Sequence, residues 1–176
     1  MTDTTTTPRE PGSLWWARPR KLCVMERPGG GGRSHRPARR EAEIAWLRDN
    51  GVRRVVSTMT SRHNLAAYDE AGLEAFHLPF EWPDAGPERL GEIIVALRGP
   101  LRRGGAMAIH ANRHTDTVAA IAAGLLYECW GTDPVDGLAA ALSAGLDVTE
   151  DCADMLGVEW EAVRFWADGG LRMLSA

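Results

Sequence analysis

The residue types best suited to chemistry lie in one short segment, HANRHTD, which follows a predicted apolar strand. Two imidazoles and a carboxylate stand close together there, and such a set could transfer protons to a bound molecule or hold a transition metal. The spacing HxxxHxD does not match a zinc pattern, so we favour proton transfer or ligand binding over a metal site. The polar residues of the segment are His110, Asn112, Arg113, His114 and Asp116.

A second set of candidate acids lies in the earlier segment EWPDAGP. Asp84 could face the same pocket as the HANRHTD segment and exchange a proton, with Glu81 as a second candidate. The alternative is structural, since Asp84 could equally form an Asx turn with Pro83 and Gly86. Trp82, beside these acids, is the aromatic residue that we expect to cover the pocket.

Both segments must be positioned by the elements around them. Apolar residues at steps of three and four predict helices, and short β-branched or apolar runs predict strands. The segment 14–33 is broken by Pro and Gly, so we expect an irregular wrap there. Strands and helices alternate before a final run of helices, which predicts an α/β domain with a central, mostly parallel sheet. The expected strands are 52–56, 73–78 and 106–109, and the expected helices are 41–50, 61–71, 90–101, 118–127, 134–144, 149–156 and 159–167.

The composition is that of an ordinary globular domain. The 176 residues carry a net charge of −4, with 44% hydrophobic and 25% charged residues, which argues against a nucleic-acid binder. No apolar run reaches the roughly 18 to 20 residues that span a bilayer, and the N-terminal segment lacks the apolar stretch of a signal peptide. We therefore expect a cytoplasmic protein with no membrane partner.

The chain divides into three expected parts. Residues 1–13 contain almost nothing to bury and are expected to form a disordered tail. A single domain over residues 14–147 follows, and residues 148–176 are expected to form a helical extension packed on it. The three cysteines have spacings that match neither a disulfide framework nor a metal knuckle, so we expect buried, inert thiols.

A glycine run and a basic stretch adjoin each other near the N-terminus. The run 29–32 lacks the GxxxxGK[ST] pattern of a phosphate loop, so we expect a flexible turn. The basic stretch could contact an anion despite the negative total charge, although a solvated loop and helix start explains it more simply. Its members are Arg33, His35, Arg36, Arg39 and Arg40.

Three stretches of the chain, from about Trp15 to Leu146, resemble the cysteine-dependent tyrosine and dual-specificity protein phosphatase superfamily. They are RPGGGGRS, then EIAWLRDNGVRRVVSTMTSRHNLAAYDEAGLEAFHLPFEWPDAGP, then LRRGGAMAIHANRHTDTVAA. In that family a helix ending in Gly-Val leads to a strand, a later strand leads to a Pro-Asp loop, and a Gly-flanked helix leads to a strand ending His-Cys. The resemblance implies a three-layer fold with helices on both faces of the sheet, and it places Asp84 at the general acid position.

The phosphate loop of the family reads HCxxGxxR followed by Ser or Thr. Its thiolate attacks phosphorus, its backbone amides cradle the oxygens, its Arg clamps them, and its His lies beneath the loop. If the following helix TVAAIAAGLL is aligned to the helix of the family, the loop here is three residues short and lacks the Cys and the Arg. Without gaps, His110 matches the His, while Ala111 stands on the Cys, His114 on the Gly, Thr117 on the Arg and Val118 on the Ser or Thr.

These departures change the expected chemistry. Without the thiolate, covalent catalysis of this kind is excluded, and loss of the Arg removes a bidentate contact to phosphate. Asp116, at the first turn of the next helix, would itself satisfy the helix N-terminus and repel a phosphate. We therefore expect a phosphatase-like protein that uses no cofactor and binds a small phosphorylated or anionic ligand, or a protein partner, without Cys-dependent hydrolysis. The ligand-binding candidates are Glu81, Trp82, His110, Ala111, Asn112, Arg113, Thr115 and Thr117.

An enzyme of altered mechanism is the alternative. It would use His114 with Asp84 or Asp116 as a proton-transferring pair on a small molecule in the same pocket. An engineered phosphatase variant is a further alternative. It would change the Cys alone, whereas the other departures of the loop favour a natural alteration.

Overall fold

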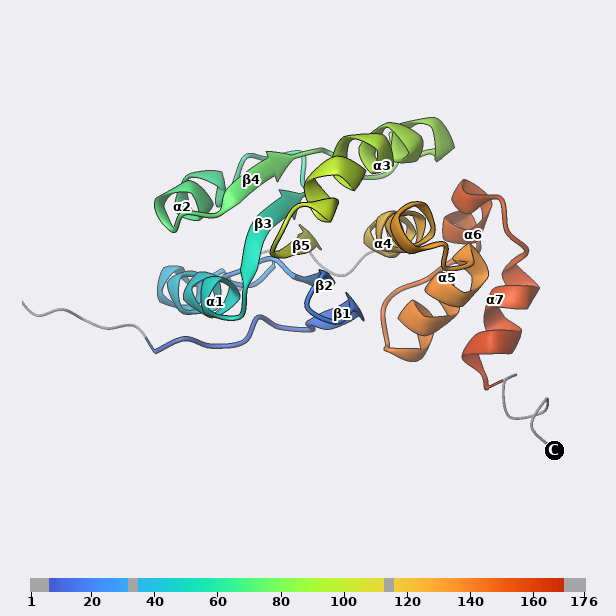
Figure 1. Ribbon diagram of the computed structural model, residues 1–176, viewed down its shortest axis with the longest axis horizontal. Helices are drawn as coiled ribbons and strands as arrows, with labels where there is room; N and C mark the ends of the chain where they lie inside the picture. The colour runs from blue at the N-terminus through green and yellow to red at the C-terminus, as the bar shows by residue number, and fades with distance from the viewer. Residues whose placement is uncertain (1–6, 32–34, 113–115, 170–176) are drawn as a thin grey trace, which may run out of the picture.

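The computed structural model describes residues 7–31, 35–112 and 116–169 (Figure 1). At its centre lies a five-stranded sheet with the order β1-β2-β5-β3-β4. β1 runs antiparallel to β2, and the other neighbouring strands are parallel, so the sheet is mostly parallel as predicted. The strands are β1 (Trp15–Arg18), β2 (Leu22–Glu26), β3 (Val52–Ser57), β4 (Glu74–His77) and β5 (Ala106–Ala111).

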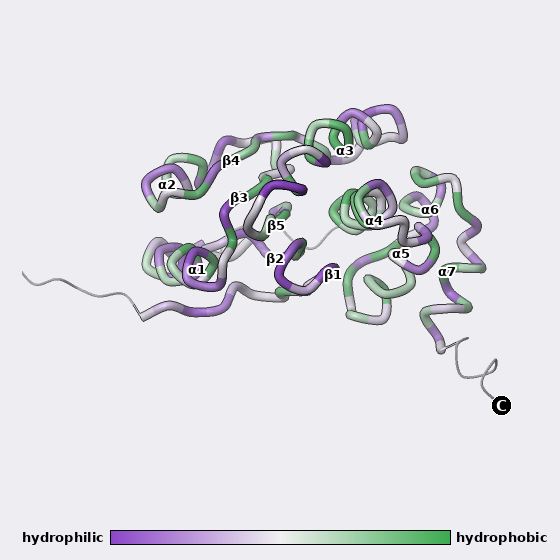
Figure 2. The backbone as a smooth tube through the Cα atoms, viewed as in Figure 1, coloured by the Kyte–Doolittle hydropathy of each residue, from purple (hydrophilic) through white to green (hydrophobic). Residues whose placement is uncertain are grey.

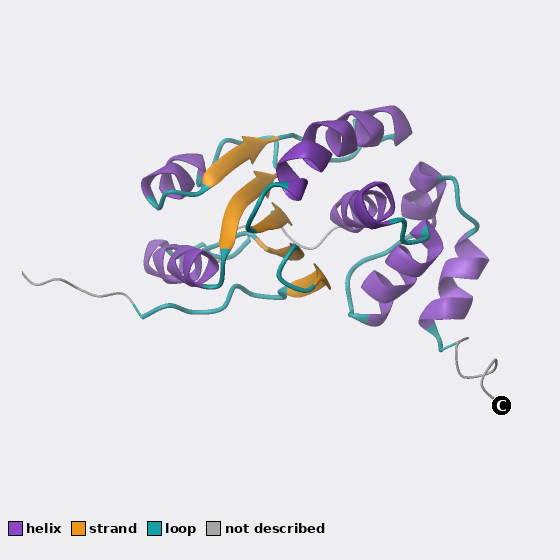
Figure 3. Cartoon of the chain, viewed as in Figure 1, coloured by secondary structure: helices purple, strands orange, loops and turns teal. Residues whose placement is uncertain are grey.

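Helices cover both faces of the sheet (Figure 1 and Figure 3). α1 and α2 lie on one face, α3 and α4 lie on the other, and α5, α6 and α7 form a further group beyond α4. The predicted three-layer α/β fold is therefore confirmed. The helices are α1 (Pro37–Asp49), α2 (Leu65–Glu70), α3 (Pro87–Arg102), α4 (Asp116–Trp130), α5 (Pro134–Ser143), α6 (Glu150–Leu156) and α7 (Trp160–Ala167).

β5 is the central strand and is buried along its whole length. Its side chains alternate between the two faces of the sheet. Met107, Ile109 and Ala111 join the core under α3 and α4, whereas Ala108 joins the core under α1 and α2. His110 follows this alternation and meets α2. The last two residues of β5 therefore belong to different layers.

α4 is the buried helix that the sequence predicts beside the sheet. Every residue from Thr117 to Leu126 is buried, and green, hydrophobic colouring covers much of this helix in Figure 2. Gly124 permits close packing on α3, because a Cβ at this position would overlap the Cδ1 atom of Ile94. Even so, neither α4 nor any other helix in the described ranges is long and apolar enough to cross a membrane.

The segment 14–33 is not the irregular wrap that the sequence predicts. It contains the hairpin of β1 and β2, in which Trp15 pairs with Val24 and Trp16 with Cys23. β2 lies between β1 and β5, and its LCVM run is buried. A strand buried on both faces shows no polar alternation, and the prolines and glycines on either side obscured this one in the sequence.

Hydrogen bonds hold the glycine turn after β2, in contrast to the flexible turn predicted. Gly29 N donates to the Oε2 atom of Glu43 at 2.8 Å, and Gly31 N donates to the Oε1 atom of Glu26 at 3.1 Å. Gly29 and Gly30 have φ values of 93° and 91°, which glycine adopts without strain. Two carboxylates therefore fix the described part of this turn.

Part of the expected N-terminal tail is tied to the domain. Arg9 N donates to the carbonyl oxygen of Ala42 at 3.1 Å, and Gly12 O accepts from the N–H of Glu26 at 3.0 Å. Residues 1–6 lie outside the described residues, so the disorder expected there stays a prediction.

Two helices begin four residues away from their predicted starts. α1 begins earlier, at Pro37, because proline suits the first turn of a helix. α2 begins later, at Leu65, because Asn64 has the left-handed conformation with φ 73°. A left-handed residue cannot continue a right-handed helix, so the residues before Asn64 form the connection from β3.

Candidate functional site

The carboxyl ends of β2, β3 and β5 meet at one edge of the sheet, where open α/β sheets bind ligands. Ala111 at the end of β5 pairs with Glu26 at the end of β2. His110 lies between Met25 of β2 and Ser57 of β3. The described start of the HANRHTD segment, residues 110–112, therefore lies at this edge.

His110 is fully buried and held by hydrogen bonds. Its Nδ1 atom lies 3.1 Å from the carbonyl oxygen of Ala111, and its Nε2 atom lies 2.9 Å from the hydroxyl of Tyr68. Because a carbonyl only accepts, Nδ1 carries the proton and Nε2 accepts from Tyr68. The carbonyl oxygen of His110 accepts from Thr58 N at 3.0 Å and Oγ1 at 3.2 Å. Burial lowers the pKa of His110 to about 4, so a neutral ring positions the end of β5.

Ala111 points to the opposite face from His110. It is 1% exposed and packs in the core with α3 and α4. Asn112, the next residue, is half-buried. The predicted residues Arg113, His114 and Thr115 lie outside the described residues, so their expected roles stay predictions.

Asp116 opens α4 and joins three segments of the chain. Its Oδ1 atom accepts from Thr117 N at 2.8 Å and from the Nε1 atom of Trp82 at 3.2 Å. Its Oδ2 atom accepts from the Oγ1 atom of Thr149 at 2.7 Å, and its carbonyl oxygen accepts from the Sγ atom of Cys152 at 3.2 Å. The bond from Thr117 N satisfies one of the free N–H groups at the helix N-terminus. The Pro-Asp loop and α6 are thus both fastened to the start of α4.

The aromatic and acidic residues of the Pro-Asp loop lie in three different surroundings. Trp82 is 47% exposed and reaches the start of α4 through Asp116. Glu81 closes a turn, since its carbonyl oxygen accepts from Asp84 N at 3.0 Å and Ala85 N at 3.1 Å. Asp84 is exposed and borders a hollow of about 560 Å³ at the start of α3. Within the described residues, no hydrogen bond joins the Asp84 carboxylate to Asp116, so a shared pocket stays a prediction.

The thiols are poor nucleophiles. Burial raises the pKa of Cys23 and of Cys152 to about 12, and both stay protonated at neutral pH. Cys129 is half-buried, and burial raises its pKa as well. In the part of the chain that the structure describes, no three His, Cys, Asp or Glu side chains come together to hold a metal ion.

The sequence reasoning missed two residues that shape this edge. Tyr68 lies in the segment AAYDE of α2 and meets His110 across 42 positions of the chain. Thr149 meets Asp116 across 33 positions. The one signal available for Tyr68 was a hydroxyl group among apolar residues of a short helix, since a buried hydroxyl needs a partner.

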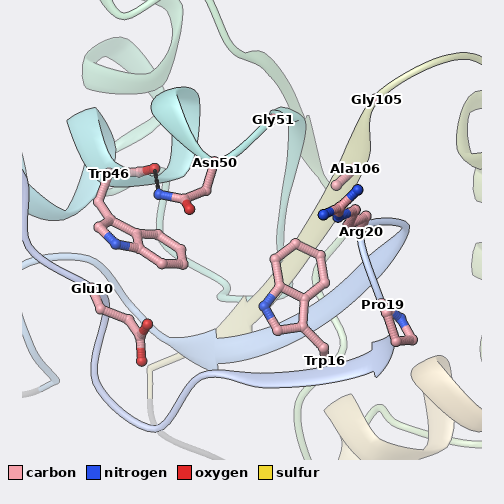
Figure 4. Close-up of a pocket in the computed structure, with 9 residues that line it drawn as sticks. All are labelled: Glu10, Trp16, Pro19, Arg20, Trp46, Asn50, Gly51, Gly105 and Ala106. Carbon is pink, nitrogen blue, oxygen red and sulfur yellow. Dashed lines mark hydrogen bonds between the residues drawn. The ribbon is translucent and has the colours of Figure 1, made fainter.

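A separate hollow of about 500 Å³ lies at the opposite edge of the sheet (Figure 4). Trp16 and Trp46 line it together with Glu10. Gly51 precedes β3 and Gly105 precedes β5, so the hollow faces the amino ends of these strands. None of the predicted site residues is among those that line it.

Comparison with known proteins shows a likeness in fold. No family model and no curated protein matches the chain. TpbA of P. aeruginosa matches with a TM-score of 0.65 over 96% of this chain and 100% of that chain, at 16% identity. Human DUSP28 matches with a TM-score of 0.61 over 97% and 99%, at 16% identity. Kinase associated phosphatase, with its catalytic-site cysteine changed to serine, matches with a TM-score of 0.61 over 84% and 88%, at 18% identity. The chain therefore has the fold of tyrosine and dual-specificity phosphatases.

Asp116→Ala should destabilise the protein more than the loss of a simple helix cap. The substitution leaves three donors without their acceptor, and we expect the free energy of unfolding to fall by roughly 2 to 3 kcal/mol. Asp133→Ala is the matched control, because the Asp133 side chain only caps α5 through Val135 N at 2.9 Å; it should cost about 1 kcal/mol. Urea denaturation measures both variants. Equal losses would show that the bonds from Trp82 and Thr149 contribute nothing.

The buried, neutral His110 should make stability depend on pH. Its pKa is about 4 in the folded protein against 6.5 for an unburied histidine, so the folded state binds fewer protons. The contribution of the neutral ring to the free energy of unfolding is complete above pH 6.5, and it is lost as the pH falls toward 4. We expect the free energy of unfolding to fall by up to roughly 3 kcal/mol more in the wild type than in His110→Gln. Urea denaturation near the two ends of this pH window measures the difference, and parallel losses would contradict the prediction.

Proposed function

We propose that this domain binds a small phosphorylated or otherwise anionic ligand at the carboxyl end of β5, without cysteine-dependent hydrolysis. The observation that carries the proposal is Ala111, which ends β5 directly after the buried His110. The phosphatase resemblance puts the nucleophilic cysteine at this position in the ungapped register. A methyl group has no electron pair with which to attack phosphorus.

The described thiols support binding over hydrolysis. Cys152 contacts the start of α4, where its Sγ atom donates to the carbonyl oxygen of Asp116 at 3.2 Å. Burial and the carboxylate of Asp116 raise the pKa of Cys152 to about 12, so the sulfur stays a protonated donor. Cys23 is enclosed within β2 and has a similarly raised pKa. Neither thiol supplies a thiolate at neutral pH.

The support beneath the loop favours a retained binding role. The hydroxyl of Tyr68 on α2 and the two donors of Thr58, directly after β3, hold His110 from two sides. The end of β5 is thereby fixed before any ligand arrives. A fixed backbone loses little further entropy on binding, which favours affinity without requiring turnover.

Asp116 sets the expected strength of binding. Its carboxylate occupies the first turn of α4, and a negative charge there opposes an incoming anion. The donors from Thr117, Trp82 and Thr149 hold the carboxylate in this position. We therefore expect phosphate groups to bind weakly, and we expect the binding to become stronger when this charge is removed.

Binding without turnover is tested with two probes on the wild-type protein. Inorganic phosphate should raise the melting temperature, whereas para-nitrophenyl phosphate should bind without releasing nitrophenol. No stabilisation by either compound would contradict the proposal. Turnover that Asp84→Asn or His114→Ala abolishes would instead establish the altered-mechanism enzyme.

Asp116→Asn should strengthen the binding of inorganic phosphate. The amide keeps the shape of the side chain and an oxygen that can accept from Thr117 and Trp82, and its NH2 group can donate to the Thr149 hydroxyl instead of accepting from it. One negative charge is removed, and we expect a gain in affinity of about five- to tenfold. Asp154→Asn on α6 is the control, because it removes the same charge from an exposed side chain elsewhere. Isothermal titration calorimetry measures both variants. Equal affinities in the two would count against an anion site at the start of α4.

A further inference from the structure

Four basic side chains gather on the α1 and α2 side of the same sheet edge, and the proposed β5 site does not use them. Arg27 follows β2, His35 and Arg40 lie at the start of α1, and His63 precedes α2. The ring centroids of His35 and His63 are 4.7 Å apart. A Cβ at Gly29 would lie 2.7 Å from the His35 ring and 3.0 Å from the Cβ of Arg40, so this turn packs against both. We call Arg27, His35, Arg40 and His63 the basic cluster.

We propose that the basic cluster binds the phosphate group of a small phosphorylated molecule, at a site separate from the β5 site. The two sites share an edge of the sheet but lie in different layers. His110 points toward the layer of the basic cluster, whereas Ala111 packs toward α3 and α4. The proposal therefore stands independently of the proposed function.

The arginines of the basic cluster carry charges that no carboxylate pairs with among the described residues. Arg27 is 4% exposed, and its Nε and Nη2 atoms donate to the carbonyl oxygen of Gly30 at 3.1 and 2.8 Å. The adjacent carboxylates are already engaged, because Arg39 pairs with Glu26 at 3.0 Å and with Glu43 at 2.6 Å. A buried cation without an anion is unfavourable, so a bound oxyanion would stabilise this arrangement.

Three buried polar atoms here make no hydrogen bond of ordinary geometry within the described residues. They are the Nε2 atom of His35, the Nε atom of Arg40 and the Oδ1 atom of Asn64. The side chain of Asn64 still interacts with His35 and raises the pKa of that ring, whereas no such interaction engages the Nε atom of Arg40. Asn64 is 6% exposed, and its amide nitrogen is fixed by donation to the carbonyl oxygen of Pro28 at 2.8 Å. Buried polar atoms almost always have partners. Phosphate oxygens would accept from Arg40 and from His35, and a singly protonated phosphate would donate to Asn64.

The electrostatics of the two imidazoles agree with this assignment. Burial lowers the pKa of His35, the charges of Arg27, His63 and Arg40 lower it further, and a side-chain hydrogen bond with Asn64 opposes them. Burial and the charges of Arg27 and Arg40 lower the pKa of His63. Both rings therefore lie in a positive potential that disfavours their own protonation. A bound phosphate would offset that potential.

Solvent reaches the edge of the basic cluster, and a helix end adjoins it. His63 is exposed and His35 is partly exposed, while Arg27 forms a buried floor. α1 begins at Pro37 without a side-chain cap and without an acidic residue in its first turn. The partial positive charge of this N-terminus adds to that of the side chains.

Titration of the whole protein with inorganic phosphate, followed by NMR at constant ionic strength, tests the proposal. We expect saturable shifts of the ring signals of His35 and His63 and of the backbone amides of Gly29 and Gly30. The indole signal of Trp46, at the opposite edge of the sheet, should stay unchanged. The same shifts with sodium chloride alone would overturn the proposal.

Arg40→Gln and Arg48→Gln form a matched pair on α1. Arg40→Gln removes a charge from the basic cluster and should weaken phosphate binding there at least tenfold. Arg48→Gln removes the same charge from the exposed last turn of the helix and should change the affinity less than twofold. His63→Gln should weaken binding as well, and urea denaturation confirms that each variant is folded. Equal affinities of Arg40→Gln and the wild type would overturn the proposal.

The location of the shifts separates this proposal from the proposed function. Shifts confined to the amides of Ala111, Asn112 and Thr117 would overturn the basic cluster as a site and support the β5 site. Shifts confined to the basic cluster would support it as a site and would contradict the β5 site. Glycerol phosphate should reproduce the effect of inorganic phosphate. Binding to phosphatidic acid vesicles without a response to either soluble probe would also overturn the proposal.

Discussion

The alternation of side chains at the end of β5 determines the layout of the whole edge. His110 and Ala111 are neighbours in the chain but belong to different layers, because consecutive residues of a strand point to opposite faces. Tyr68 holds His110 at 2.9 Å on the α2 side, and Ala111 packs toward α3 and α4. A slip of one residue would put the imidazole into the apolar core beneath α4. The neighbouring strands β2 and β3 prevent this slip. Each side chain at the end of β5 therefore stays on its own face of the sheet.

Asp116 links that edge to the rest of the domain. Both of its carboxylate oxygens accept hydrogen bonds, and the donors come from the Pro-Asp loop, from α4 itself and from the residue before α6. Proton exchange by this residue stays a prediction, but the structure gives its carboxylate a positioning role. The loop that carries Trp82 and the start of α6 both bond to this one side chain, so we expect a change at Asp116 to affect both.

The sequence predicted the elements whose signals are local. The helical periodicity of α3, the uniformly apolar α4 and the apolar β5 each show within one stretch of chain, and the structure confirms all three. β2 was missed because its LCVM run is short and lies between proline and glycine residues. Tyr68 and Thr149 could not be predicted, because their partners His110 and Asp116 are distant in the chain and are brought near only by the packing of the helices. The match of Ala111 to the nucleophile position came from a motif alone and stays a prediction, whereas its place at the end of β5 is observed.

The basic stretch before α1 shows why charge in a sequence does not by itself predict a binding site. Arg39 and Arg40 are adjacent, but successive side chains of a helix point about 100° apart. Arg39 turns to Glu26 and Glu43, which neutralise it, whereas Arg40 lies beside the turn that packs on His35. The structural role therefore belongs to Arg39, and the proposed anion contact belongs to Arg40. The position of the local carboxylates decides which cation is left for a ligand, and only the folded chain sets that position.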